Sequence, residues 1–415
     1  MTFEQVHRQE WARVVAILAR SFSDLDLAED TAAEAFATAL ARWPVDGWPD
    51  NPGAWLVTVA RNHALDRVRR ESTRGDRQAA AHAALVERAS AEGLDDRDLT
   101  TGPMADDRLR LLFTCCHPAL APEARIALTL RMVGGLTTAE VARAFLVPEA
   151  TMSQRLLRAK RKIAVARISY HAPEAAELPG RLDGVLRVIA LIFREGYSPS
   201  GGDRLPRAEL CDEAIRLGRL LVELVPDEGE ATAVLALMLL QHSRRSARLD
   251  DAGEVVLLVD QERADWDHSA IREGAALTIW ALRRGRGRYA LQAALAACHA
   301  TAPSSTEVDW LTIVTLYDEL AELDASPAVA LNRAVAVAEV DGPRAALALL
   351  DGLALTDRGA SLVRTSHQVV AVRADLLRRS GRDDEARYAY RQAITQAPTA
   401  PERRYFERRI RELTS

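Results

Sequence analysis

Apolar residues recur at helical spacing along almost the whole chain of 415 residues. No segment shows the alternation of apolar and polar residues that marks a half-buried strand. Ala, Leu and Arg dominate the composition, and all three are strong helix formers. A chain of this length is too long for one ordinary core. The sequence therefore predicts an all-α protein with two to three domains.

Charge is distributed unevenly along the chain. Residues 1–170 carry 23 basic and 22 acidic side chains, a net charge of +1, while residues 171–415 carry 31 and 37, a net charge of −6. The overall charge of −5 does not by itself indicate a nucleic-acid-binding protein. The first part contains local basic clusters, and the second part is acidic.

Cysteine use and the N-terminus indicate the compartment. The chain has four scattered cysteines, Cys115, Cys116, Cys211 and Cys298, which fits a reduced cytosolic protein better than a disulfide framework. The charged N-terminus does not resemble a signal peptide, and no apolar run reaches membrane-spanning length. We expect a cytoplasmic protein that does not engage a membrane.

Periodicity and composition divide the chain into four parts. The expected domains are residues 1–75, with three helices, and residues 105–168, with four. Residues 76–104 are rich in Ala, Arg, Asp and Gly without clear periodicity, so we expect a linker there. Residues 175–415 are expected to form helical hairpins throughout.

The C-terminal part resembles a repeat array. Val370–Pro398 is the clearest unit, with small residues at the expected helix crossing and a proline at the end, a pattern typical of tetratricopeptide units. Asn332–Leu350 predicts another helical pair. The spacing of these two units is about forty residues rather than about thirty-four, so we expect an irregular array.

A helix-turn-helix is the strongest local signal. Gly135–Arg143 contains Thr137 or Thr138 as a helix cap and Glu140 as its capping-box partner, and a turn follows at Leu146–Pro148. A second helix then follows. Its apolar residues Met152, Leu156, Ala159, Ile163 and Ala166 step by four and three.

The second helix has a basic outer face. Six basic residues and no carboxylate lie between Ala150 and Pro173. Guanidinium, hydroxyl and amide groups on such a face suit a DNA major groove. A solvated basic face is an equally good interpretation of this helix alone, and the preceding helix and turn favour DNA binding.

An acidic helix start and an aromatic–basic helix form a second signal. Asp26–Asp30 and Ala33–Phe36 are followed by Trp55–Asn62. Together with the helix-turn-helix, and in this order, these segments resemble an extracytoplasmic-function (ECF) sigma factor of bacterial RNA polymerase, with a region 2 domain, a linker and a region 4 domain. The rest of the chain resembles the subgroup of these factors with a tetratricopeptide-like C-terminal extension.

The resemblance implies partners and site residues. The partners would be core RNA polymerase, through the β′ clamp coiled coil and the β subunit, and promoter DNA, double-stranded and melted. The implied polymerase-binding residues are Asp26, Glu29, Asp30, Glu34 and Phe36. The implied region 2 promoter contacts are Arg61, Asn62, Arg67, Arg69 and Arg70. The implied helix-turn-helix contacts are Thr151, Gln154, Arg155, Arg158, Lys160 and Lys162.

Three features qualify these roles. The acidic helix start, taken alone, is also explained by stabilisation of the helix dipole. Trp55 fits a core position better than a base-stacking one. Met152-Ser153-Gln154 stands where the family more often has an aliphatic residue, a basic residue and Ser, which puts the family's usual upstream sequence preference in doubt.

No group of residues forms a catalytic or cofactor site in the sequence. Adjacent cysteines chelate zinc poorly, and Cys115-Cys116-His117 has no second ligand pair nearby in the sequence. We therefore expect no enzyme activity, no metal and no cofactor.

Two other functions stay open, a DNA-binding regulator that does not enter polymerase and an interaction scaffold. The acidic C-terminal part is expected to regulate in cis, by holding the two sigma-like domains or the polymerase. A regulatory protein or ligand is expected as a separate partner of this part.

Overall fold

The computed structural model describes residues 2–72, 104–170 and 177–413, apart from 146, 167, 169, 198–207, 249, 251–255, 355–366 and 398–399. Every regular element in these residues is a helix, which confirms the predicted all-α class. The chain forms two compact units, residues 1–191 and 192–415. The expected linker lies almost entirely outside the described residues.

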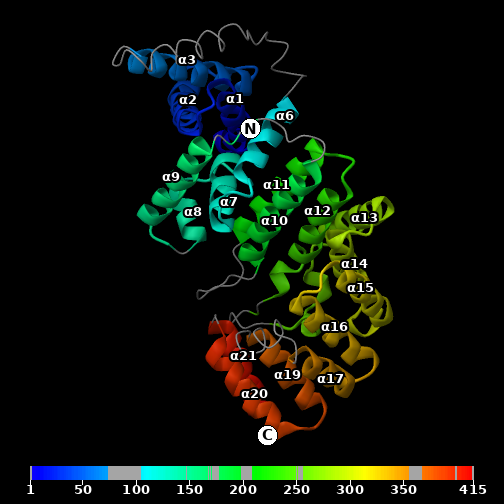
Figure 1. Ribbon diagram of the computed structural model, residues 1–415. Helices are drawn as coiled ribbons and strands as arrows, with labels where there is room; N and C mark the ends of the chain where they lie inside the picture. The colour runs from blue at the N-terminus through cyan, green and yellow to red at the C-terminus, as the bar shows by residue number, and fades with distance from the viewer. Residues whose placement is uncertain are drawn as a thin grey trace. The chain divides into compact units, whose positions relative to one another are not determined.

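The first unit opens with three helices that pack on one another. They are α1 (Phe3–Phe22), α2 (Leu25–Asp46) and α3 (Pro52–Ser72) (Figure 1). α2 begins where Asp24 Oδ1 accepts hydrogen bonds from the backbone N–H groups of Asp26 and Leu27. An aromatic cluster fills the space between α1 and α2, with Trp11 and Phe36 ring centroids 5.7 Å apart. Helical spacing places Leu40 on the same face as Phe36 and Trp43, but its side chain is 58% exposed.

The second helical group of this unit carries the helix-turn-helix. It comprises α6 (Met104–Cys115), α7 (Pro122–Leu128), the π-helical turn η1 (Thr129–Val133), α8 (Thr138–Ala144) and α9 (Glu149–Val165). The sequence predicts one helix over residues 122–133, but its last turn widens to a π-helix. A π-turn inserts one residue and rotates the side chains that follow it. α9 ends at Val165, so Ala166, predicted on its core face, is exposed.

The helix α10 (Leu178–Tyr197) contains the division between the two units. Arg181, near its start, donates a hydrogen bond of 2.8 Å to the backbone carbonyl of Phe113 on α6, and its guanidinium lies 5.9 Å from the Phe113 ring centroid. Residues 178–191 therefore belong to the first unit, beyond the end predicted for the helix-turn-helix domain.

The second unit is a succession of helices, each packed on its neighbours in sequence (Figure 1). The contacts of this unit join helices that are one or two places apart in the chain, which is the arrangement of helical-repeat proteins. The α-helices are α11 (Ala208–Leu224), α12 (Gly229–His242), α13 (His268–Arg284), α14 (Arg288–Thr301), α15 (Trp310–Leu323), α16 (Pro327–Val340), α17 (Pro343–Ala354), α19 (His367–Arg379), α20 (Asp383–Gln396) and α21 (Ala400–Glu412). Short 3₁₀ turns lie at Arg245–Ala247, Leu258–Asp260, Arg263–Asp265 and Ser305–Glu307.

The hairpin of α19 and α20 has the predicted small-residue crossing. Ala374 and Ala386 are fully buried, and Tyr390 packs beside them at 1% exposure. Gly381 connects the two helices with a φ of +72°, a left-handed conformation that favours glycine. The predicted helical pair around residue 342 is α16 and α17. None of the described helices is long and apolar enough to cross a membrane.

A half-buried histidine is expected to make the stability of the second unit depend on pH. Burial, with the guanidinium groups of Arg244 and Arg263 nearby, lowers the pKa of His299 on α14 to about 4. The unfolded chain binds a proton near pH 6.5, so stability is complete above that pH and falls as the pH drops toward 4. We expect the loss to reach roughly 1 to 1.5 kcal/mol at pH 5.5.

Urea unfolding at pH 7.5 and pH 5.5 measures this loss. His299→Gln should reduce the difference between the two pH values, while His268→Gln, which removes an exposed histidine of α13, should leave it unchanged. An equal difference in all three proteins would show that His299 does not set the pH dependence.

Candidate nucleic-acid interface

A capping box holds the first helix of the helix-turn-helix. Thr137 Oγ1 accepts a hydrogen bond from the backbone N–H of Glu140 at 3.2 Å, and Glu140 Oε2 accepts one from the backbone N–H of Thr137 at 2.7 Å. This confirms the predicted cap and selects Thr137 over Thr138. Ala142 is buried on α8, which packs directly against α9. The short α8 thus presents α9 at a fixed angle.

Because α8 has only seven residues, the cap contributes a large share of its stability. We expect Thr137→Ala to lower the free energy of unfolding by about 1 kcal/mol. Chemical denaturation of the full chain measures the change, and Thr138→Ala serves as the matched control because its side chain does not cap the helix. Equal effects of the two substitutions would contradict the assignment.

The outer face of α9 is available to a partner. Met152, Leu156, Ala159 and Ile163 are buried, which confirms those four core positions. Five of the six implied DNA-contact residues lie on the other side, Thr151, Gln154, Arg158 and Lys162 exposed and Arg155 half-buried. The Arg155 guanidinium lies 5.6 Å from the Phe145 ring centroid, which orients it. A face of hydroxyl, amide and guanidinium groups suits base edges and phosphates.

Lys160 does not share this face. It lies nine residues after Thr151, which is a half-turn away around the helix. Its side chain is 14% exposed and forms ion pairs with Glu29 at 2.9 Å and with Asp26. In this arrangement Lys160 is not available to DNA, contrary to the sequence-based prediction.

A second exposed polar face runs along α3. Asn62 is exposed, and Arg69 lies seven residues later on the same side at 69% exposure. Arg70 is also exposed, and Arg61 is half-buried. Arg67 is partly engaged, because it donates a 2.8 Å hydrogen bond to Asp30 Oδ2 of α2. Most of the residues implied for region 2 promoter contact thus lie at or near one surface.

Three tryptophans surround the start of α3. Trp55 is half-buried and packs 5.4 Å from the buried Trp43, which fits its expected core position. Trp48 packs 4.9 Å from Trp43 but is 46% exposed. It lines a shallow hollow with Pro49, Asp50 and Pro52. The sequence analysis did not select Trp48, and its only signal was an aromatic residue inside a proline-rich loop.

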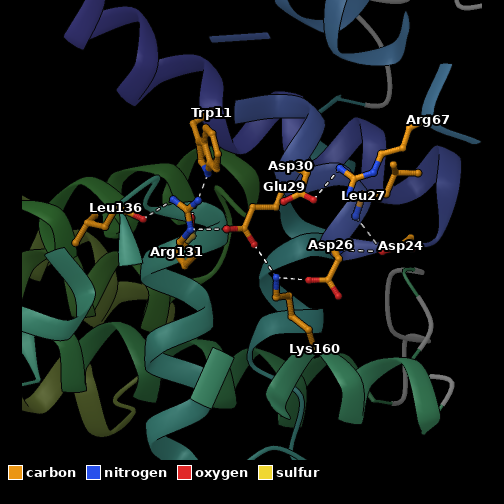
Figure 2. Close-up of polar contacts among 10 residues, drawn as sticks. All are labelled: Trp11, Asp24, Asp26, Leu27, Glu29, Asp30, Arg67, Arg131, Leu136 and Lys160. Carbon is orange, nitrogen blue, oxygen red and sulfur yellow. Dashed lines mark hydrogen bonds and ion pairs between the residues drawn. The ribbon is translucent and has the colours of Figure 1, made fainter. Parts of the chain in front are cut away.

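Four carboxylates of α2 are engaged, those of Asp26, Glu29, Asp30 and Glu34, and Figure 2 shows the contacts of the first three. Glu29 Oε1 accepts a 2.6 Å hydrogen bond from Arg131 Nε of η1, and Glu29 Oε2 pairs with Lys160. Asp30 pairs with Arg67. Glu34, which the figure does not label, lies 3.5 Å from His63 of α3.

Phe36 occupies a different position from these carboxylates. It is 4% exposed and packs edge-on against the rings of Phe3 and His7. Its ring therefore stabilises the junction of α1 and α2 and does not reach a partner, which corrects its predicted polymerase contact.

The paired cysteines at the end of α6 are buried. Burial raises the pKa of the Cys116 thiol to about 11, and its sulfur lies 3.5 Å from the hydroxyl of Thr129. Burial also raises the pKa of Cys115. Both thiols are protonated at neutral pH and pack as small apolar groups. Within the described residues, no group of three or more His, Cys, Asp or Glu could hold a metal ion.

Three segments of the chain match known families. Residues 7–74 match Sigma-70 region 2, residues 110–163 match Sigma-70 region 4, and residues 181–282 match a family of unknown function (DUF6596). The first two matches cover the exposed faces of α3 and α9. No solved structure matches the chain.

Curated relatives extend these matches. An uncharacterised protein of Rhizobium meliloti is 43% identical over 97% of this chain and 94% of its own length. A probable ECF RNA polymerase sigma factor, SigI of Mycobacterium tuberculosis, is 32% identical over 50% of this chain and 66% of its own. The ECF RNA polymerase sigma factor SigK of Mycobacterium ulcerans is 30% identical over 37% of this chain and 79% of its own.

The region 2 and region 4 matches occur in the order that the sequence analysis predicts, and a relative named as a sigma factor is matched over most of its length. Sigma factors are transcription initiation factors and not enzymes. The chain belongs to the extracytoplasmic-function family of RNA polymerase sigma factors.

Proposed function

We propose that this sigma factor binds core RNA polymerase and directs it to promoters through the exposed faces of α3 and α9. The observation that carries the proposal is the α9 face, where five of the six implied DNA contacts lie together, away from the buried side of the helix. Such a partner places the protein in the cytoplasm. The proposed domains are residues 1–75 and 105–168, joined by a linker at 76–104, with an extension over 175–415.

The acidic start of α2 is the proposed polymerase-binding surface. Asp26, Asp30 and Glu34 are about half exposed, and Glu29 lies between them at 13% exposure. A carboxylate row of this kind complements a basic helical hairpin such as the β′ clamp coiled coil. The β subunit is the second proposed polymerase contact.

The surface around α3 is proposed to hold melted promoter DNA. The Asn62 amide can donate to and accept from a base edge, and the half-exposed Trp48 offers an aromatic face on which an unstacked base can rest. Arg69 and Arg70 supply positive charge for backbone phosphates. Capture of an unstacked base requires no covalent chemistry, so RNA synthesis is catalysed by the polymerase.

The helical extension is proposed to regulate the factor in cis, by holding the two sigma domains or the polymerase, and a regulatory protein or ligand is proposed as its own partner. Its support is the net charge of −6 over residues 171–415 and the repeat-like packing that offers extended surfaces. A cut near residue 170 would remove Arg181 from its place against Phe113. A chain ending at residue 197 keeps α10 and is the better truncation.

The proposed function is tested by assembling a complex of this protein with core RNA polymerase. Full-length protein is mixed with purified core RNA polymerase, separated by size exclusion, and offered a pool of genomic promoter fragments. We expect a stoichiometric complex that retains specific fragments. A stable protein that forms no complex with core polymerase would contradict the proposal. Unchanged fragment selection and signal response in the chain ending at residue 197 would exclude regulation by the extension.

A further inference from the structure

An ion network joins α2 to the helix-turn-helix group inside the first unit. Four residues form it, Asp26 and Glu29 from α2, Arg131 from η1 and Lys160 from α9 (Figure 2). We call this set the clasp. Its two carboxylates and two cations balance in charge. The partners are far apart in sequence, by 102 residues for Glu29 and Arg131 and by 131 for Glu29 and Lys160.

Glu29 has a cation at each of its carboxylate oxygens. One carboxylate oxygen accepts from Arg131 and the other from Lys160, while the three side chains are only 13–14% exposed. Burial opposes the charge of Lys160, but the carboxylates of Glu29 and Asp26 outweigh it and raise the pKa of the ammonium above its ordinary value. With a cation at each oxygen and only 13% of the side chain exposed, Glu29 is shielded from a further cation in this arrangement.

The backbone beside Arg131 is fixed by a second contact. The Trp11 indole N–H of α1 donates a 3.1 Å hydrogen bond to the Arg131 carbonyl, and the Arg131 guanidinium lies 5.1 Å from the Trp11 ring centroid. Arg131 also donates to the carbonyl of Leu136, in the turn before α8. Arg131 thus connects α1, α2 and the entry to the helix-turn-helix.

A further ion pair joins the same two helical groups at another point. Asp107 of α6 is 4% exposed and lies 3.5 Å from Arg20 of α1. The closed arrangement is therefore held by charged contacts at two places. Buried ion pairs contribute little net stability, since desolvation offsets much of the attraction. Contacts of this kind can be exchanged for equivalent ones from a partner.

We propose that the clasp is an autoinhibitory contact, in which the helix-turn-helix group occupies the acidic face of α2 that core RNA polymerase would bind. This inference rests on the proposed function of α2. A basic polymerase surface and the pair Arg131 and Lys160 compete for the same carboxylates, so the closed protein cannot dock through them. Binding of polymerase exchanges the ion pairs and frees α2 from the helix-turn-helix group.

Chemical coupling of lysine amines to carboxylates tests the clasp directly. The chain contains two lysines, Lys160 and Lys162, and Lys160 belongs to the clasp. A water-soluble carbodiimide couples a lysine amine to a carboxylate in direct contact with it. In the free full-length protein we expect Lys160 to couple to Glu29 or Asp26. The exposed Lys162, on the outer face of α9, is the internal control and should not couple to either. Peptide mass spectrometry identifies the pairs.

The coupled protein is then offered to core RNA polymerase. We expect chains coupled through Lys160 to be depleted from the polymerase-bound fraction, and prior addition of polymerase to suppress the coupling. Equal shares of coupled protein in the bound and unbound fractions would overturn the inference, as would the absence of any Lys160 coupling in the free protein. Failure of the uncoupled protein to bind would instead contradict the proposed function.

Arg131→Gln provides an independent measurement, since Arg131 is not among the proposed polymerase or DNA contacts. It removes one cation of the clasp and should tighten apparent binding to core polymerase by about tenfold, because the open fraction rises. Arg125→Gln is the matched control, as Arg125 bonds the carbonyls of Leu120 and Pro118 in its own helical group. Thermal unfolding of each variant confirms that it is folded. Unchanged or weaker binding by a folded Arg131→Gln protein would contradict autoinhibition.

Discussion

Arg155→Ala is expected to reduce transcription from a specific promoter by about tenfold to a hundredfold while leaving core-polymerase binding unchanged. The guanidinium is held on the outer face of α9 against Phe145, where it can make a two-pronged contact with a guanine edge. Loss of such a contact costs about 1–3 kcal/mol of discrimination. Quantitative run-off assays on one template measure the change.

Two matched variants separate base recognition from general charge. Lys162→Ala removes an exposed cation of the same face and should weaken binding uniformly across sequences while lowering its salt dependence. Arg187→Ala, on α10, removes an arginine already paired with Asp183 and should have no effect. A loss for Arg187→Ala as large as that for Arg155→Ala would show that the transcription assay responds to charge alone.

Gly135→Ala is expected to destabilise the first unit by about 2–4 kcal/mol. Gly135 has a φ of +74°, and an added Cβ would lie 3.1 Å from the Trp11 ring. The left-handed conformation costs about 1–2 kcal/mol for an L-residue, and overpacking costs typically 1–3 kcal/mol. The turn must shift away from Trp11 to relieve the contact. Chemical denaturation of the full chain measures the sum.

Gly381→Ala separates the two causes. Gly381 has a φ of +72°, close to that of Gly135, but an added Cβ would meet no atom within 4 Å. We therefore expect a loss of only about 1–2 kcal/mol there. Equal losses at Gly135 and Gly381 would mean that the contact of the turn with Trp11 adds no strain.

Local patterns made much of the fold predictable. Helix periodicity and the Thr137–Glu140 spacing depend on neighbours within four residues, and the structure has both the helices and the cap. The same is true of the α19–α20 hairpin, whose small residues and Gly381 act within one repeat. The break in the predicted helix at residue 129 had no comparable signal, because a π-turn follows from packing rather than from composition.

The candidate site was predictable only in part. Charge composition grouped Lys160 with the other cations of its helix, although its position a half-turn away from Thr151 already separated it. The carboxylates that Lys160 meets lie more than 130 residues earlier, and no local rule connects such positions. Phe36 shares a motif with the acidic residues, but helix geometry turns its ring into the core.

Run-off transcription with purified core RNA polymerase and the full-length protein tests the central claim most directly. The templates are genomic fragments selected by the assembled complex, and start sites are mapped. The proposed function predicts transcripts from defined start sites that depend on the added protein and are lost with Asn62→Ala or Arg155→Ala. A protein that binds core polymerase yet yields no start site above that of core enzyme alone would contradict it.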